Sequence, residues 1–296
     1  MKMTSSINLP PTSSTYQLIE CPRDAMQGWK NFIPTEKKVE YIHSLLEVGF
    51  DTIDFGSFVS PKAIPQIADT KEVIKKLNLQ NSTSGLLVIV ANIRGAEEAA
   101  RYDEINYLGF PFSISETFQQ RNTNSSIKES LDKVDEIQNL CKKHDKQLVI
   151  YLSMGFGNPY GDIYNDEILL KWTDEMVKKE VNIISLADTV GIASPEQILF
   201  ALHTLLPKYP QTTIGVHLHS TVNNWKEKLE AAVNAGCKRI DGALKGIGGC
   251  PMAGSDLVGN MSTELIISYL EGKDVKTGLN NEALLKSLRL ASDIFN

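Results

Sequence analysis

The chain has 296 residues, of which 42% are hydrophobic and 22% are charged, and its formal net charge is −6. This composition is typical of a globular protein with a sizeable core, and the acidic balance argues against nucleic-acid binding, which usually needs a basic surface. No apolar stretch approaches the length that would span a membrane.

The first 15 residues are rich in Ser, Thr and Pro and lack an apolar signal region, so we expect residues 1–15 to be a flexible leader. After them, short apolar runs that predict strands alternate with stretches of helical spacing. In chain order, the expected strand and helix pairs are 16–20 and 35–48, 52–55 and 69–77, 86–90 and 97–101, 105–113 and 126–144, 148–152 and 166–179, 183–187 and 194–206, 213–217 and 225–235, and 239–243 and 262–271.

Eight alternating units predict an α/β fold with parallel strands and right-handed crossovers. Eight units in just under 300 residues fit a (β/α)8 TIM barrel that forms a single domain over residues 16–296. We expect the last residues to form a helix that packs beneath or beside the barrel. The alternative is a doubly wound open sheet, but no GxGxxG follows the first predicted strand.

Unusual polar residues gather where the predicted strands end, although the strands were assigned from apolar runs alone. Barrel enzymes build their active sites at the C-terminal ends of the strands. These residues are, in strand order, Arg23, Asp24 and Gln27, Asp54, Asn92, Ser113 and Glu116, Asp188 and Thr189, His217 and His219, and Cys250 and Asn260.

His217 and His219 lie at positions i and i+2 of a predicted strand end, so their rings should point to the same side. Two imidazoles on one side form half of a metal site. With a carboxylate and an amide oxygen they suit Mg²⁺ or Mn²⁺, and Zn²⁺ or Co²⁺ are also compatible. Alone, the Arg23-Asp24 pair would be read as a surface salt bridge.

Other polar residues have structural interpretations that stay open. Asp54 and Asp188 fit helix N-caps as well as they fit catalytic roles. Asn92 and Asn260 are common turn or cap residues.

None of the four cysteines forms a CxxC pair, so we expect reduced thiols, no zinc ribbon and a cytoplasmic location. Cys21, Cys141 and Cys237 lie in or directly beside predicted strands and helices, where core packing explains them. Cys250 lies in a Gly-Ile-Gly-Gly-Cys-Pro segment, which favours a reactive or acid–base thiol.

Taken together, these motifs resemble those of the 3-hydroxy-3-methylglutaryl-CoA lyase family, within the DRE-TIM metallolyase superfamily. The resemblance extends from about residue 16 to about residue 278. The matching segments are Pro22-Arg-Asp-Ala-Met-Gln27, Ser57-Phe-Val-Ser-Pro-Lys62, Ser115-Glu-Thr-Phe118, Asn124-Ser-Ser-Ile-Lys-Glu-Ser130, Leu186-Ala-Asp-Thr-Val-Gly191, His217-Leu-His219, Gly246-Ile-Gly-Gly-Cys-Pro251 and Gly259-Asn260.

The resemblance implies a metal-dependent retro-Claisen cleavage of an acyl-CoA into acetyl-CoA and acetoacetate, carried out by a homodimer. It implies that Mg²⁺ or Mn²⁺ is bound by Asp24, His217, His219 and Asn260. Either Asp24 or His217 would act as the base.

The resemblance also implies roles around the substrate. Arg23 would stabilise the enolate, and Cys250 would take part in proton transfer on a closing loop. The residues expected at the substrate are Arg23, Gln27, Asp54 and Asn92.

The chain departs from the family pattern at several positions. Family members usually carry glutamate where Asp54 stands, and the usual HxHDT ends in Ser220-Thr221 here, which removes a carboxylate. The usual GCPYEG reads Gly157-Asn-Pro-Tyr-Gly-Asp162, and Ala-Met replaces Gly-Leu after Arg-Asp. A lyase for a related 3-hydroxyacyl-CoA, a condensing synthase for acetyl-CoA and a 2-oxo acid, and a barrel that only binds acyl-CoA are therefore the alternatives.

Overall fold

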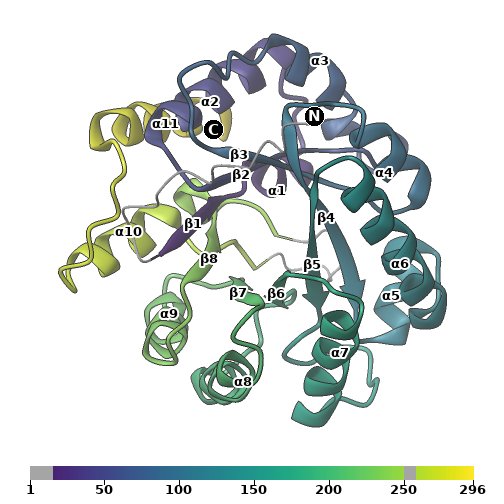
Figure 1. Cartoon of the computed structure of the whole chain (residues 1–296). Coiled ribbons are helices and arrows are strands. Elements are labelled where there is room, and N and C mark those ends of the chain that lie inside the picture. The colour runs from purple at the N-terminus through teal and green to yellow at the C-terminus, as the bar shows by residue number, and fades with distance from the viewer. Residues whose placement is uncertain (1–15, 250–257) are drawn as a thin grey trace, which may run out of the picture.

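Eight parallel strands form a closed barrel in the computed structural model, which describes residues 16–249 and 258–296 (Figure 1). The strands are β1 Gln17–Glu20, β2 Thr52–Ser57, β3 Gly85–Ile89, β4 Ile105–Ser113, β5 Gln147–Ser153, β6 Ile183–Asp188, β7 Thr213–Leu218 and β8 Arg239–Gly242. β1 pairs in parallel with both β2 and β8, which closes the sheet. The predicted (β/α)8 barrel is confirmed, and the open-sheet alternative is wrong.

The helices surround the barrel as an outer ring, except α1, which lies inside this ring beside β2 (Figure 1). They are α1 Pro22–Gln27, α2 Thr35–Val48, α3 Thr70–Lys76, α4 Ile93–Ala99, α5 Glu116–Thr123, α6 Ile127–Lys143, α7 Asp166–Lys178, α8 Pro195–Lys208, α9 Trp225–Asn234, α10 Thr263–Glu271 and α11 Asn281–Ile294. α11 packs beside α2, where Ser287 Oγ donates to Ser44 Oγ at 2.9 Å. No helix among the described residues is long and apolar enough to cross a membrane.

Three helix predictions differ from the structure for local reasons. α4 begins at Ile93 rather than at residue 97, because the Asn92 side chain caps it and accepts the Gly95 N–H at 2.9 Å. α5 was not predicted because its sequence is mostly polar, with Phe118 as its large apolar residue, and a Ser115 cap on the Phe118 N–H starts it instead. α1 was missed because it has only six residues and begins with Pro22.

Alternation along the strands decides which side chains face the barrel interior. On β5, Leu148, Ile150 and Leu152 join the core between the barrel and its helices. Val149 and Tyr151 belong to a separate inner cluster with Leu87. The same alternation sends His217 of β7 inward, beside Asp241 of β8, its partner in the strand register. The barrel interior therefore carries charged and titratable groups directly beneath its C-terminal mouth.

Candidate active site

Asp24, His217 and His219 meet at the C-terminal end of the barrel. Each offers a ligand atom, and these atoms all lie within 4.8 Å of one another. The Nε2 atoms of the two histidines are 3.3 Å apart, so the prediction that both rings face the same side is confirmed. Two nitrogen lone pairs at this separation repel each other unless a proton or a cation lies between them. The group is therefore a possible site for a divalent cation.

His217 is oriented by Asp241, a residue that the sequence reasoning missed. Its Nδ1 lies 3.3 Å from Asp241 Oδ2, so in the neutral ring Asp241 holds the proton on Nδ1 and leaves the Nε2 lone pair facing His219. Burial alone would lower the pKa of His217, but the hydrogen bond and charge of Asp241 raise it above its usual value. Arg239 donates to Asp241 Oδ1 at 2.7 Å and pairs with this carboxylate from the side opposite His217's contact with Oδ2. The i, i+2 spacing of Arg239 and Asp241 on β8 was the signal available for finding the pair.

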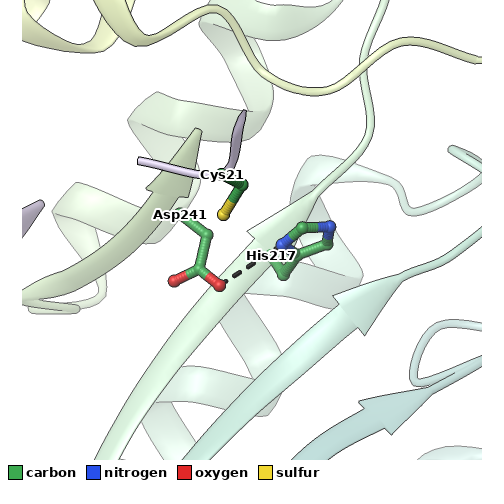
Figure 2. A group of neighbouring side chains, drawn as sticks. All are labelled: Cys21, His217 and Asp241. Atoms are coloured by element: carbon green, nitrogen blue, oxygen red, sulfur yellow. Dashed lines mark hydrogen bonds and ion pairs between the residues drawn. The ribbon is translucent and has the colours of Figure 1, made fainter. Parts of the chain in front are cut away.

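Cys21 approaches the same edge of His217. Figure 2 shows its thiol beside Asp241 and the imidazole, and these three residues form a second close group of potential ligands. Burial, followed by the charge of Asp241, raises the pKa of Cys21 well above its usual value, so the thiol stays protonated. We therefore interpret Cys21 as an uncharged, buried side chain that packs against the site, in keeping with its predicted packing role.

Asn260 adds an amide to the group formed by Asp24 and the two histidines. Its Nδ2 donates to Asp24 Oδ2 and to the Ile247 carbonyl, both at 2.8 Å, which leaves its side-chain oxygen for another partner. The close approach depends on Gly248, because a Cβ there would lie 2.5 Å from Asn260 Nδ2 and 2.7 Å from the Asp24 carbonyl. One glycine of the Gly-Ile-Gly-Gly segment thus lets the chain close over the site.

Arg23 is fixed by three side chains. Its Nε and Nη2 atoms both donate to the Asp54 carboxylate, the shortest distance being 2.5 Å. Asp54 therefore forms a two-nitrogen ion pair with Arg23 and is not a helix cap. Its Nη1 donates to Asp24 Oδ1 at 2.9 Å and to Gln27 Oε1 at 2.7 Å. Burial would lower the pKa of Arg23, but the charges of Asp54 and Asp24 raise it, so the guanidinium is permanently cationic.

The Asp24 carboxylate is ionised despite its burial. Burial raises its pKa, but the charges of Arg23, His217 and His219 and the hydrogen bond from Asn260 lower it to about 2. The pKa of His219 is lowered to about 4 by burial and by the charge of His217. At neutral pH the group therefore contains an anionic carboxylate and a neutral His219, the protonation states in which these side chains bind cations.

Not every residue predicted for the site lies in this cluster. Asn92 is exposed and its side-chain oxygen caps α4, as the cap interpretation of its sequence predicted. Cys250 lies outside the described residues. Asp188 is neither a helix cap nor part of the group of potential ligands, because its carboxylate receives the buried ammonium of Lys228 at 2.7 Å.

The fold and the arrangement of polar residues can be compared with known proteins. A family model described as HMGL-like matches residues 17–291. Hydroxymethylglutaryl-CoA lyase YngG of Bacillus subtilis strain 168 is 34% identical over 269 residues, covering 90% of this chain and 89% of the relative. The mitochondrial hydroxymethylglutaryl-CoA lyase of Bos taurus is 32% identical over 287 residues, covering 96% and 86%.

Solved structures agree with these relatives. An HMG-CoA lyase structure from Bacillus subtilis has a TM-score of 0.88 and 31% identity, covering 96% of this chain and 95% of that one. An HMG-CoA lyase from Acinetobacter baumannii, in complex with coenzyme A and 3-methylmalate, has a TM-score of 0.87 and 27% identity, covering 99% and 93%. The chain therefore belongs to the HMGL-like family, and it is a lyase.

Proposed function

We propose that this protein cleaves 3-hydroxy-3-methylglutaryl-CoA to acetyl-CoA and acetoacetate in a divalent-metal-dependent retro-Claisen reaction. One observation carries the proposal: Arg23, Asp24, His217, His219 and Asn260, which come from three distant segments, converge at the C-terminal mouth of the barrel. The relatives that cover most of the chain are hydroxymethylglutaryl-CoA lyases.

The metal would be Mg²⁺ or Mn²⁺, held by Asp24, His217, His219 and Asn260. The donor set of one carboxylate, two imidazole nitrogens and one amide oxygen has no thiolate, and it suits these cations. The 3.3 Å separation of the two Nε2 atoms supports a shared cation. When bound, the cation would act as a Lewis acid and as a template for the substrate's oxygens.

The side chains would carry out the rest of the reaction. A base removes the proton of the C3 hydroxyl, and Asp24 and His217 are the two groups placed to accept it. The C2–C3 bond then breaks, and its electron pair passes into the thioester enolate. Arg23 would stabilise that negative charge, because Asp54 and Gln27 hold its guanidinium rigidly and leave it cationic.

An acid must finally protonate C2 to release acetyl-CoA. We assign this step to Cys250, whose place in the Gly-Ile-Gly-Gly-Cys-Pro segment is the supporting observation. The described part of that segment, residues 246–249, reaches the site, because Gly248 lies against Asn260 and Asp24.

The substitution of aspartate for the family's glutamate at position 54 is compatible with this substrate. Asp54 still binds Arg23 through two oxygens, so the shorter side chain reaches its partner. Asp54 is fully buried behind Arg23, which supports a role in positioning the arginine. The acyl-CoA class is supported by the relative whose structure contains coenzyme A. The cytoplasmic location and the homodimer stay predictions of the sequence.

The test is acetoacetate release from 3-hydroxy-3-methylglutaryl-CoA by purified protein with Mg²⁺ or Mn²⁺ and a thiol reductant. We expect turnover that EDTA abolishes and that His219→Ala loses. His203→Ala is a matched control, because His203 is exposed on α8 and away from the cluster. Folded, metal-loaded protein without turnover would contradict the proposal and would direct attention to related 3-hydroxyacyl-CoA substrates or to synthase activity.

A further inference from the structure

Lys228 is a buried charged side chain behind the metal-ligand group. It lies on α9, and its side chain is only 2% exposed. Its ammonium donates to three oxygens: Asp188 Oδ2 at 2.7 Å, the Gly191 carbonyl at 2.9 Å and the His219 carbonyl at 3.0 Å. These three acceptors use all three N–H groups of a lysine.

The first two acceptors belong to one loop. Asp188 ends β6, and its other oxygen accepts the Ala193 N–H at 3.1 Å. The pair with Lys228 is fully buried, so each charge depends on the other for compensation. Lys228 thereby fixes the turn that follows β6.

The third acceptor belongs to the site itself. The His219 carbonyl is part of the same residue whose ring lies 3.3 Å from His217. On the other side of this peptide, the Ser220 N–H donates to the Gly259 carbonyl at 2.9 Å, next to Asn260. The backbone of His219 is therefore held between α9 and the segment that carries Asn260.

We propose that Lys228 is a positioning residue for the divalent-cation site: by holding the His219 carbonyl, it sets the position of the His219 ring relative to His217 and Asp24. The inference rests on the proposed function. Lys228 contacts none of the reacting atoms, so its effect reaches the site only through His219 and the turn after β6. Loss of a partner that orients a metal ligand typically costs about 10–100-fold in metal affinity.

The experiment measures Mn²⁺ affinity from the EPR signal of free Mn²⁺, together with the melting temperature and the rate of acetoacetate release. Lys228→Met keeps the length of the side chain and removes its charge. Lys38→Met is the matched control: Lys38 is also 2% exposed and pairs with Asp69 at 2.6 Å, but it lies on α2 and contacts no residue of the cluster. We expect both variants to melt earlier, and only Lys228→Met to bind Mn²⁺ about 10–100-fold more weakly.

A double variant separates positioning from charge balance. Lys228→Met with Asp188→Asn removes both buried charges, so it should recover stability while the His219 carbonyl stays unsupported. Weak Mn²⁺ binding in the double variant supports the inference. Mn²⁺ binding equal to that of the unaltered protein, in either Lys228 variant, overturns it. Unaltered protein that binds Mn²⁺ and releases no acetoacetate would instead contradict the proposed function, and the affinity comparison would still decide the role of Lys228.

Discussion

Two buried carboxyl groups only four residues apart are in opposite protonation states. Glu20, at the end of β1, is fully buried, and burial raises its pKa to about 8. Asp24, in α1, is 6% exposed, yet its pKa is lowered to about 2 because the charges of Arg23 and the two histidines outweigh its burial. Burial acts in the same direction on both, so the neighbouring charges decide the difference.

The hydrogen-bond partners show what each group is suited to do. Glu20 accepts the Leu244 N–H at 2.9 Å and the Thr263 hydroxyl at 2.5 Å, which are neutral donors. It therefore acts as a neutral cross-link between β1 and the segment after β8. Asp24 instead lies beside Arg23 and the histidines, where a permanent negative charge can bind a cation. One short segment thus supplies both a structural acid and an ionised carboxylate that is suited to bind a cation.

Removal of the charge of Asp24 should have the largest effect. Asp24→Asn keeps the shape and the acceptor oxygen, but it removes the anion and leaves Asp54 as the remaining carboxylate paired with Arg23. We expect acetoacetate release to fall by roughly 10³-fold, since the cation would lose its only charged ligand. Titration with Mn²⁺ should show a parallel loss of binding. Full activity in Asp24→Asn would show that the low pKa of this group has no functional meaning.

Replacement of Asp241 tests whether a charge behind the site affects cation binding through His217. In Asp241→Asn the ring of His217 loses a charged partner, and we expect Mn²⁺ affinity at pH 8 to fall by about 10–100-fold. Because Asp241 raises the pKa of His217, its loss should also lower the pH below which Mn²⁺ is released. General destabilisation predicts no such shift in the pH profile. An unchanged pH profile of Mn²⁺ binding would show that Asp241 does not influence the site through His217.

Glu20→Gln should alter stability and spare the site. The folded pKa of Glu20 is raised to about 8, above the value expected for an unfolded chain, so the folded state binds the extra proton. Its favourable contribution is complete below the unfolded pKa and is lost as pH rises towards 8. Glutamine imitates the protonated acid and does not titrate, so the variant should gain roughly 2 kcal/mol of unfolding free energy relative to the native protein between pH 6 and pH 8.

Denaturant unfolding at several pH values measures this gain. Glu136→Gln is the control, because Glu136 is exposed on α6. The Mn²⁺ affinity of Glu20→Gln should match that of the native protein. A stability difference that does not vary with pH would mean that Glu20 is ionised in the fold, and the contrast with Asp24 would fail.

The sequence was sufficient to predict the barrel because every strand carries an apolar run and successive runs alternate with helices. The elements it missed, α1 and α5, are short, and their starts depend on local features such as Pro22 and the Ser115 cap. Apolar periodicity cannot reveal helices of this kind. The late start predicted for α4 has the same origin, since Asn92 reads equally well as a cap and as a ligand-binding residue.

Geometry around the site was predictable only where spacing along one strand determines it. The i, i+2 spacing of His217 and His219 predicted that their rings face the same side. The contact of Lys228 with the His219 carbonyl could not be foreseen, because a lysine on a helix is ordinarily exposed. Such partners depend on packing between elements and emerge only in the folded structure.

Asn92→Ala should give the smallest effect. It tests whether Asn92 has a structural role, like Glu20, or a role in the active site, like Asp24. Asn92 was predicted to bind substrate, yet its side-chain oxygen accepts the Gly95 N–H at 2.9 Å, a neutral backbone partner like those of Glu20. If that is its whole role, the variant should lose about 1 kcal/mol of unfolding free energy, the usual value for an N-cap, with KM unchanged. Asn92→Asp, which can still cap α4, is the matched control and should keep the native stability. A rise in KM for Asn92→Ala at unchanged stability would instead place Asn92 at the substrate, as the sequence predicted.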